Sequence, residues 1–111
     1  MQDFKRRSYP ISIADQIPYG VIGAYILSRD GQSANYVGRS DRDLGSEIVK
    51  TANALNAGYT HFFFERTETP HEAYIQECKW FHSYSFVDNK EHPKPPEGRV
   101  ARCPICTSTY V

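Results

Sequence analysis

Residues 21–38, VIGAYILSRDGQSANYVG, decide the fold of this chain. Residues 21–27 are rich in β-branched and aromatic side chains, which favour a β-strand. Asp30-Gly31 is a turn signal, and residues 34–37 are again typical of a strand. We therefore predict a β-hairpin of strands 21–27 and 34–37, joined by a loop longer than two residues.

The residues after the hairpin have a pattern typical of a helix. Apolar side chains recur at helical spacing at Leu44, Ile48, Ala52 and Leu55. Ser40 and Asp43 precede them with the spacing of a capping box, and Gly58 follows as a stop signal. The first helix is expected between these signals.

Residues 59–65 and 70–84 predict a further strand and a second helix. The segment 59–65 contains three consecutive phenylalanines and is short, so we expect a central strand buried on both faces. Thr69 suits the N-cap of the following helix, Pro70 its first position and Glu72 the reciprocal cap. The prolines within residues 89–98 exclude regular helix there.

These elements indicate one α+β domain over residues 1–111, with a core at about 20–90 and an irregular tail at about 90–111. The expected architecture is a small three-stranded sheet flanked by helices. No apolar run approaches the ~18 residues of a membrane span, and the basic N-terminus lacks the apolar segment of a signal peptide. We therefore expect a cytoplasmic protein without a membrane partner.

The charge of the chain is balanced overall but unevenly distributed. Thirteen basic and thirteen acidic residues cancel, which argues against a polyanion binder that relies on bulk charge. Positive charge gathers in residues 1–7 and 90–102, whereas residues 41–77 are acidic. A nucleic acid would therefore have to bind through local patches.

Cysteine and histidine residues near the C-terminus indicate a metal site. The three cysteines are an odd number, so a framework of disulfides is not expected, and a metal site or plain thiols are the alternatives. Cys78 and His82 share one helical face, and Cys103 and Cys106 form a C-x-x-C pair. Structural Zn²⁺ accepts these four ligands in tetrahedral geometry and would hold the tail to the last helix. His92 is either a substitute ligand or a solvent-facing loop residue.

Glu77 lies within the apolar stripe of the second predicted helix, which comprises Ala73, Trp80, Phe81 and Tyr84. An ionised carboxylate on a core-facing stripe is costly unless it is paired, binds a cation or lines a cleft. The alternative is a residue at the edge of the stripe whose carboxylate reaches solvent.

Several of these features together resemble the GIY-YIG nuclease family. Gly23-Ala24-Tyr25 and Tyr36-Val37-Gly38 resemble its two tripeptides, which lie on adjacent strands of a small mixed sheet. The order hairpin, helix, strand, helix matches the family, and Glu72-Ala73-x-x-x-Glu77 is similar to its glutamate-bearing helix motif. Asn89 lies near the spacing of the family's late asparagine. The resemblance covers about residues 20–90, and the Cys-Pro-x-Cys tail resembles members with a structural zinc.

The resemblance implies a metal-dependent endonuclease that hydrolyses phosphodiester bonds in nucleic acid, with DNA favoured over RNA and both left open. Tyr25 and Tyr36 would line the active site, with one of them activating or orienting a water molecule. Glu77 would hold one divalent cation, Mg²⁺ or Mn²⁺, because hard cations favour carboxylate oxygen. Asn89 belongs to the same implied set of site residues.

The chain departs from the family in the first turns of helix one. The family has a phosphate-binding arginine there, whereas this chain has Ser46 and Glu47. Arg39 is the expected phosphate contact in its place, and Arg42 is expected to be solvated. Loss of a charge partner for the transition state could cost about a few kcal/mol of barrier.

This departure leaves two other hypotheses beside the nuclease. One is a catalytically inactive relative that binds nucleic acid or another partner. The other is a small zinc-containing domain for protein interaction, with no nucleic-acid role.

Overall fold

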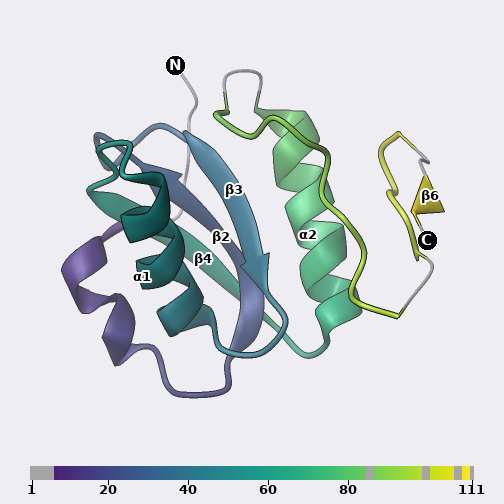
Figure 1. The fold of residues 1–111 in the computed structure, drawn as a ribbon, viewed down its shortest axis with the longest axis horizontal. Helices are drawn as coiled ribbons and strands as arrows, with labels where there is room; N and C mark the ends of the chain where they lie inside the picture. Colours follow the sequence, from purple (N-terminus) through teal and green to yellow (C-terminus); the bar gives the residue numbers. More distant parts are fainter. Residues whose placement is uncertain (1–6, 85–86, 99–100, 107–108, 111) are drawn as a thin grey trace.

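A computed structural model describes residues 7–84, 87–98, 101–106 and 109–110 (Figure 1). Its elements, in chain order, are β1 (Tyr9–Pro10), the 3₁₀ helix η1 (Ile11–Gln16), β2 (Ile22–Ser28), β3 (Tyr36–Ser40), α1 (Leu44–Leu55), β4 (His61–Thr67), α2 (Pro70–Ser83), β5 (Ala101–Arg102) and β6 (Thr109–Tyr110). The protein is therefore α+β, and the predicted order of hairpin, helix, strand and helix is confirmed. Within the described part of the chain, no helix has the length and apolarity that a membrane span requires.

The main sheet has four strands in the order β1-β4-β2-β3, and all neighbouring pairs are antiparallel. The prediction of a three-stranded mixed sheet is therefore wrong in both number and direction. The additional strand comes from the segment expected to be irregular, where Tyr9 lies opposite Phe62 and their rings are 5.7 Å apart. A strand of two residues is too short to show a period-two pattern, so the sequence does not indicate it.

The sheet lies between the two long helices, as Figure 1 shows. Successive side chains of a strand point to opposite faces. Tyr25 and Leu27 of β2 accordingly pack in one cluster with α1 and η1, while Ala24 and Ile26 pack in another with Trp80 of α2. The neighbouring strand β4 also contributes a buried phenylalanine to each cluster, which confirms the predicted central strand.

The starts of the two helices were predicted with different success. The capping box of α2 is confirmed, because Thr69 Oγ1 accepts from Glu72 N at 3.1 Å and Glu72 Oε1 accepts from Thr69 N at 3.2 Å. The predicted box of Ser40 and Asp43 is only half present: Ser40 Oγ accepts from Asp43 N at 2.9 Å, but Ser40 belongs to β3 and Asp43 is the N-cap of α1. Asp43 Oδ1 instead accepts from Gly20 N at 2.8 Å, which holds the segment before β2.

Beyond α2, residues 88–98 run alongside this helix and lead to the C-terminal tail (Figure 1). The tail was expected to be irregular, but β5 and β6 form a short antiparallel pair. Its first part is held against α2, because Ala101 and Cys103 pack with Tyr74 and Cys78 in a buried cluster.

Candidate functional site

An open pocket of about 580 Å³ lies where β3, α2 and residues 89–97 meet. Four of the five predicted catalytic residues line it: Tyr36, Arg39, Glu77 and Asn89. Two come from the edge strand β3, one from the middle of α2 and one from the segment after it. The fold therefore brings together residues that lie up to 53 positions apart, from Tyr36 to Asn89.

Glu77 and Arg39 form a largely buried ion pair in this pocket. Arg39 Nη1 donates to Glu77 Oε1 at 2.8 Å, and the side chains are only 13% and 11% exposed for Arg39 and Glu77 respectively. Arg39 Nε also donates to Asp41 Oδ1 at 2.8 Å, and Nη1 donates to the carbonyl oxygen of Lys94. Glu77 is therefore stabilised within the apolar stripe of α2 by a charge partner, and it does not extend into bulk solvent.

Burial decides the acidity of Glu77. It raises the pKa of this carboxyl to about 7, and the Arg39 guanidinium only partly opposes the effect. The carboxyl group is thus close to the balance of its two protonation states at neutral pH. A cation that binds to it would favour the ionised state.

The two predicted tyrosines lie in different environments. Tyr36 is half-buried and lines the pocket, and burial together with Glu77 raises the pKa of its phenol. Tyr25 is 2% exposed, and its hydroxyl donates to Thr51 Oγ1 at 2.9 Å. Thr51 in turn donates to Glu47 Oε2 at 3.1 Å, so Tyr25 reaches a pocket residue through two hydrogen bonds and does not line the pocket itself.

Gly38 explains why Tyr25 can occupy its position. The two residues lie opposite each other on β3 and β2, and a Cβ atom on Gly38 would lie 2.4 Å from Tyr25 Cζ. The space normally taken by a side chain is therefore filled by the ring of Tyr25. The glycine of the second tripeptide has a packing role in this structure.

Asn89 binds backbone groups of the edge strand with its side-chain amide. Asn89 Oδ1 accepts from Val37 N at 2.9 Å, and Nδ2 donates to Val37 O at 2.7 Å. These two bonds fix the start of the segment 89–97 along β3. Asn89 therefore positions the part of the pocket lining that residues 89–97 provide.

Ser46 and Glu47, the two residues at the position of the family's arginine, differ in whether they line the pocket. Glu47 lines the pocket that contains Glu77, whereas Ser46 lies outside it and donates to Asp43 O at 3.3 Å. Arg42 lines the same pocket and is exposed, so the pocket has two arginines, Arg39 of β3 and Arg42 of the β3–α1 connection.

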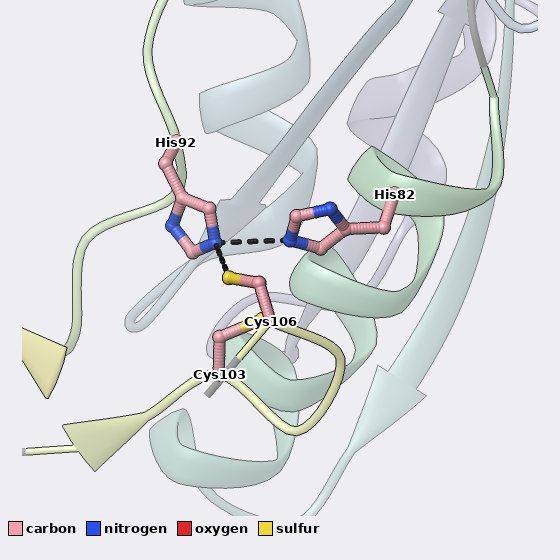
Figure 2. A group of neighbouring side chains, drawn as sticks. All are labelled: His82, His92, Cys103 and Cys106. Carbon is pink, nitrogen blue, oxygen red and sulfur yellow. Dashed lines mark hydrogen bonds between the residues drawn. The ribbon is translucent and has the colours of Figure 1, made fainter. Parts of the chain in front are cut away.

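Four metal-binding side chains meet beside the pocket, as Figure 2 shows, and one of them, His92, also lines the pocket. They are His82, His92, Cys103 and Cys106, and their ligand atoms all lie within 4.8 Å of one another. His82 Nε2 and His92 Nε2 are 3.1 Å apart, and Cys106 Sγ is 3.4 Å from His92 Nε2. We call these four residues the His/Cys cluster.

The His/Cys cluster has the dimensions of a tetrahedral metal site. Zinc–nitrogen bonds of about 2.05 Å and zinc–sulfur bonds of about 2.3 Å give tetrahedral edges of about 3.3 Å between nitrogens and about 3.5 Å between nitrogen and sulfur. The observed separations of 3.1 and 3.4 Å are close to these edges. Two of the six ligand separations thus match a tetrahedral site and the others do not exceed 4.8 Å, so the cluster could hold a metal ion if its ligands draw together.

The hydrogen bonding of His92 supports the same conclusion. His92 Nδ1 lies 2.7 Å from the carbonyl oxygen of Pro93, which can only accept, so Nδ1 carries the proton. Nε2, which faces His82 and Cys106, is then the ring atom left to bind a metal. A backbone carbonyl that fixes the tautomer in this way is typical of metal-binding histidines.

The cluster differs from the predicted ligand set in one residue. His92 takes the place expected for Cys78, which is fully buried and packs against Tyr74 and Cys103. Burial raises the pKa of the Cys78 thiol to about 12, which disfavours the thiolate that a metal binds. The preference of sequence reasoning for a solvent-facing His92 was wrong, because only the path of residues 88–98 along α2 brings this ring to His82.

Sequence reasoning also missed Asp41 and Thr51. Asp41 forms the second ion pair of Arg39, and Thr51 links Tyr25 to Glu47. Neither belongs to a motif, although an aspartate two residues after Arg39, just beyond the end of β3, is a signal for a local pair.

No family model, curated protein or solved structure matches this chain. The resemblance to GIY-YIG nucleases therefore depends on the residues themselves and on the order of the elements.

Proposed function

We propose that this protein is a GIY-YIG-type endonuclease that hydrolyses phosphodiester bonds in nucleic acid, with DNA as the expected substrate. The observation that supports this most is the buried pair of Glu77 and Arg39, which lines one open pocket together with Tyr36. A buried carboxylate beside a guanidinium and a phenol supplies a cation ligand, a phosphate contact and a group that can orient water.

The pocket suits a divalent cation as well as a phosphate. Among its described lining residues, five are carboxylates (Asp41, Glu47, Glu77, Glu91 and Glu97) and three are lysine or arginine (Arg39, Arg42 and Lys94). A phosphodiester would be repelled by this excess of negative charge unless a cation enters with it. Mg²⁺ or Mn²⁺ at Glu77 would polarise the phosphoryl oxygen and stabilise the leaving oxygen.

The other residues of the pocket have separate roles in this proposal. Arg39 lines the pocket, is held there by Asp41 and Glu77, and would present a fixed positive charge to the phosphate. Tyr36 is protonated at neutral pH as an ordinary phenol is, and burial raises its pKa further. Its hydroxyl therefore acts as a hydrogen-bonding group that orients the attacking water.

A second candidate is a nucleic-acid-binding protein without turnover. Glu47 favours it, because this carboxylate lines the pocket where the family resemblance implies an arginine. Such a protein would bind nucleic acid without cleavage, and divalent cations would not increase its affinity.

Nicking of supercoiled plasmid in the presence of Mg²⁺ or Mn²⁺ tests the proposal. Wild-type protein should nick the plasmid, and Glu77→Gln should lower the rate by roughly a hundredfold or more, because one electrostatic partner of the transition state is lost. Glu68→Gln is the matched control, since Glu68 is exposed and lies outside the pocket.

The outcomes separate the two candidates. Equal nicking by wild type and Glu77→Gln would refute the assignment of Glu77. Binding of the plasmid without nicking under all conditions would favour the second candidate. Restoration of nicking by Glu47→Arg would then show that Glu47 is what blocks turnover.

We propose that the His/Cys cluster binds Zn²⁺ in a structural role. Two imidazoles and two thiolates are a common zinc ligand set, and four protein ligands leave no open position for catalysis. The ion would join α2, residues 88–98 and the tail. Protein purified without chelator should contain about one zinc per chain, and Cys106→Ser should lose it whereas Cys78→Ala should keep it.

A further inference from the structure

The segment 88–94 connects the His/Cys cluster to the pocket, and its two ends are held differently. At its first end, Asp88 N donates to Asn35 O, and the side chain of Asn89 binds the backbone of Val37. These contacts are made to the sheet and its hairpin loop. The first end is therefore fixed by hydrogen bonds that need no metal.

The second end of the segment lies at the His/Cys cluster. His92 belongs to the cluster, and two residues later the carbonyl oxygen of Lys94 accepts from Arg39 Nη1. Pro93 lies between them and is buried, and its ring restricts the backbone. The position of the Lys94 carbonyl is thus coupled to the position of His92.

The Lys94 carbonyl is one of three groups that hold the Arg39 guanidinium, and the other two are the carboxylates of Asp41 and Glu77. Arg39 Nη1 donates both to Glu77 Oε1 and to Lys94 O, so one proton is bound by a charged acceptor and the other by a neutral one. Without the carbonyl, a partly buried N–H loses its acceptor, which is unfavourable unless the guanidinium moves. The neutral acceptor also leaves the charge of Arg39 less compensated than a third carboxylate would.

We propose that a metal ion held by His82, His92, Cys103 and Cys106 sets the position of Arg39 in the pocket through the Lys94 carbonyl oxygen. The cluster is then a positioning element for the pocket as well as a support for the tail. Its effect on cleavage rests on the proposed function, but its effect on Arg39 does not.

NMR of the arginine Nε–H groups tests the coupling directly in zinc-loaded, ¹⁵N-labelled protein. Arg39 Nε donates to Asp41, so its signal reports the guanidinium, and Arg39→Lys assigns it. In Cys106→Ser, which alters a residue outside the pocket, exchange of this Nε–H with water should become roughly tenfold faster as its protection is lost. In Cys106→His, which restores a ligand at an exposed position, the wild-type signal should return.

Arg29 provides the internal control. Its Nε donates to Ala57 O at 2.7 Å, and its guanidinium pairs with Asp88 at the end of the segment that needs no metal. The Arg29 signal should therefore be the same in all these proteins. An unchanged Arg39 signal in zinc-free, folded Cys106→Ser would overturn the proposal.

Substitution of the metal covers the case in which Cys106→Ser does not fold. Wild-type protein loaded with Cd²⁺, a larger ion, should show a shifted Arg39 Nε–H signal and an unshifted Arg29 signal. Identical Arg39 signals in the zinc and cadmium forms would overturn the proposal.

If wild type nicks plasmid, Cys106→Ser should also lower kcat by roughly tenfold to a hundredfold with little change in KM, because a catalytic group is misplaced. Absence of nicking by wild type would refute the proposed function alone, and the NMR result would still decide this inference.

Discussion

Replacement of Asn89 by alanine should destabilise the protein by an amount that follows from two hydrogen bonds. The variant leaves Val37 N and Val37 O of the edge strand without the partners that lie at 2.9 and 2.7 Å in wild type. Each bond contributes about 1 kcal/mol net, so we expect a loss of about 2 kcal/mol in the free energy of unfolding. For a domain of this size that corresponds to a decrease in Tm of roughly 10 °C.

Thermal unfolding followed by circular dichroism, with urea unfolding for the free energy, measures this effect. Asn53→Ala is the matched control, because Asn53 is exposed on α1 and alanine is the better helix former there. It should leave Tm unchanged or raise it slightly. A Tm for Asn89→Ala within about 2 °C of wild type would refute the argument that the Asn89 amide holds the segment to β3, given the shift expected for two bonds.

Three further predictions concern Glu77, Gly38 and the cysteines. Because burial raises the pKa of Glu77 to about 7, the folded protein keeps a proton that the unfolded chain loses from about pH 4.5. Without added Mg²⁺ or Mn²⁺, wild type should therefore lose about 3 kcal/mol of stability relative to Glu77→Gln as the pH rises from 4.5 to 7. Urea unfolding of both proteins at pH 5 and 8 measures this difference. A gain in the stability of wild type relative to Glu77→Gln at the higher pH would contradict the prediction. Gly38→Ala places a Cβ atom 2.4 Å from Tyr25 Cζ, so we expect a loss of about 2 kcal/mol by overpacking, and an unchanged urea midpoint would be inconsistent with that contact. After chelation of zinc at pH 8, Cys106 should react quickly with iodoacetamide and Cys78 slowly, because Cys78 is buried and its pKa is raised to about 12. Peptide mass spectrometry measures the alkylation of both cysteines. Fast alkylation of Cys78 in the folded protein would contradict its assignment to the core.

The predictable parts of the fold are those with local causes. The start of α2 was predicted correctly because Thr69, Pro70 and Glu72 act within one turn of the chain. The strand β1 was missed because its two residues are ordered by Phe62, which lies far away in the sequence. Local patterns cannot indicate a strand whose only cause is its partner.

The same distinction applies to the candidate site. Glu77 was identified because a carboxylate in an apolar stripe requires an explanation, and its partner Arg39 was named only through the family resemblance. The proline-rich surroundings of His92 concealed its role, because the ring reaches His82 only through the path of residues 88–98 in space. The chemistry proposed for the pocket remains a prediction until plasmid nicking is measured.

The two outer strands of the main sheet also bear on how the protein behaves at high concentration. An unpaired strand edge is a template on which another chain can add, which leads to aggregation. The outer strand β1 is only two residues long and ends in Pro10, which has no backbone N–H to donate. On the outer strand β3, the side chain of Asn89 is hydrogen-bonded to both backbone groups of Val37. The sheet therefore terminates itself at both sides, which should keep copies of this small protein from joining edge to edge.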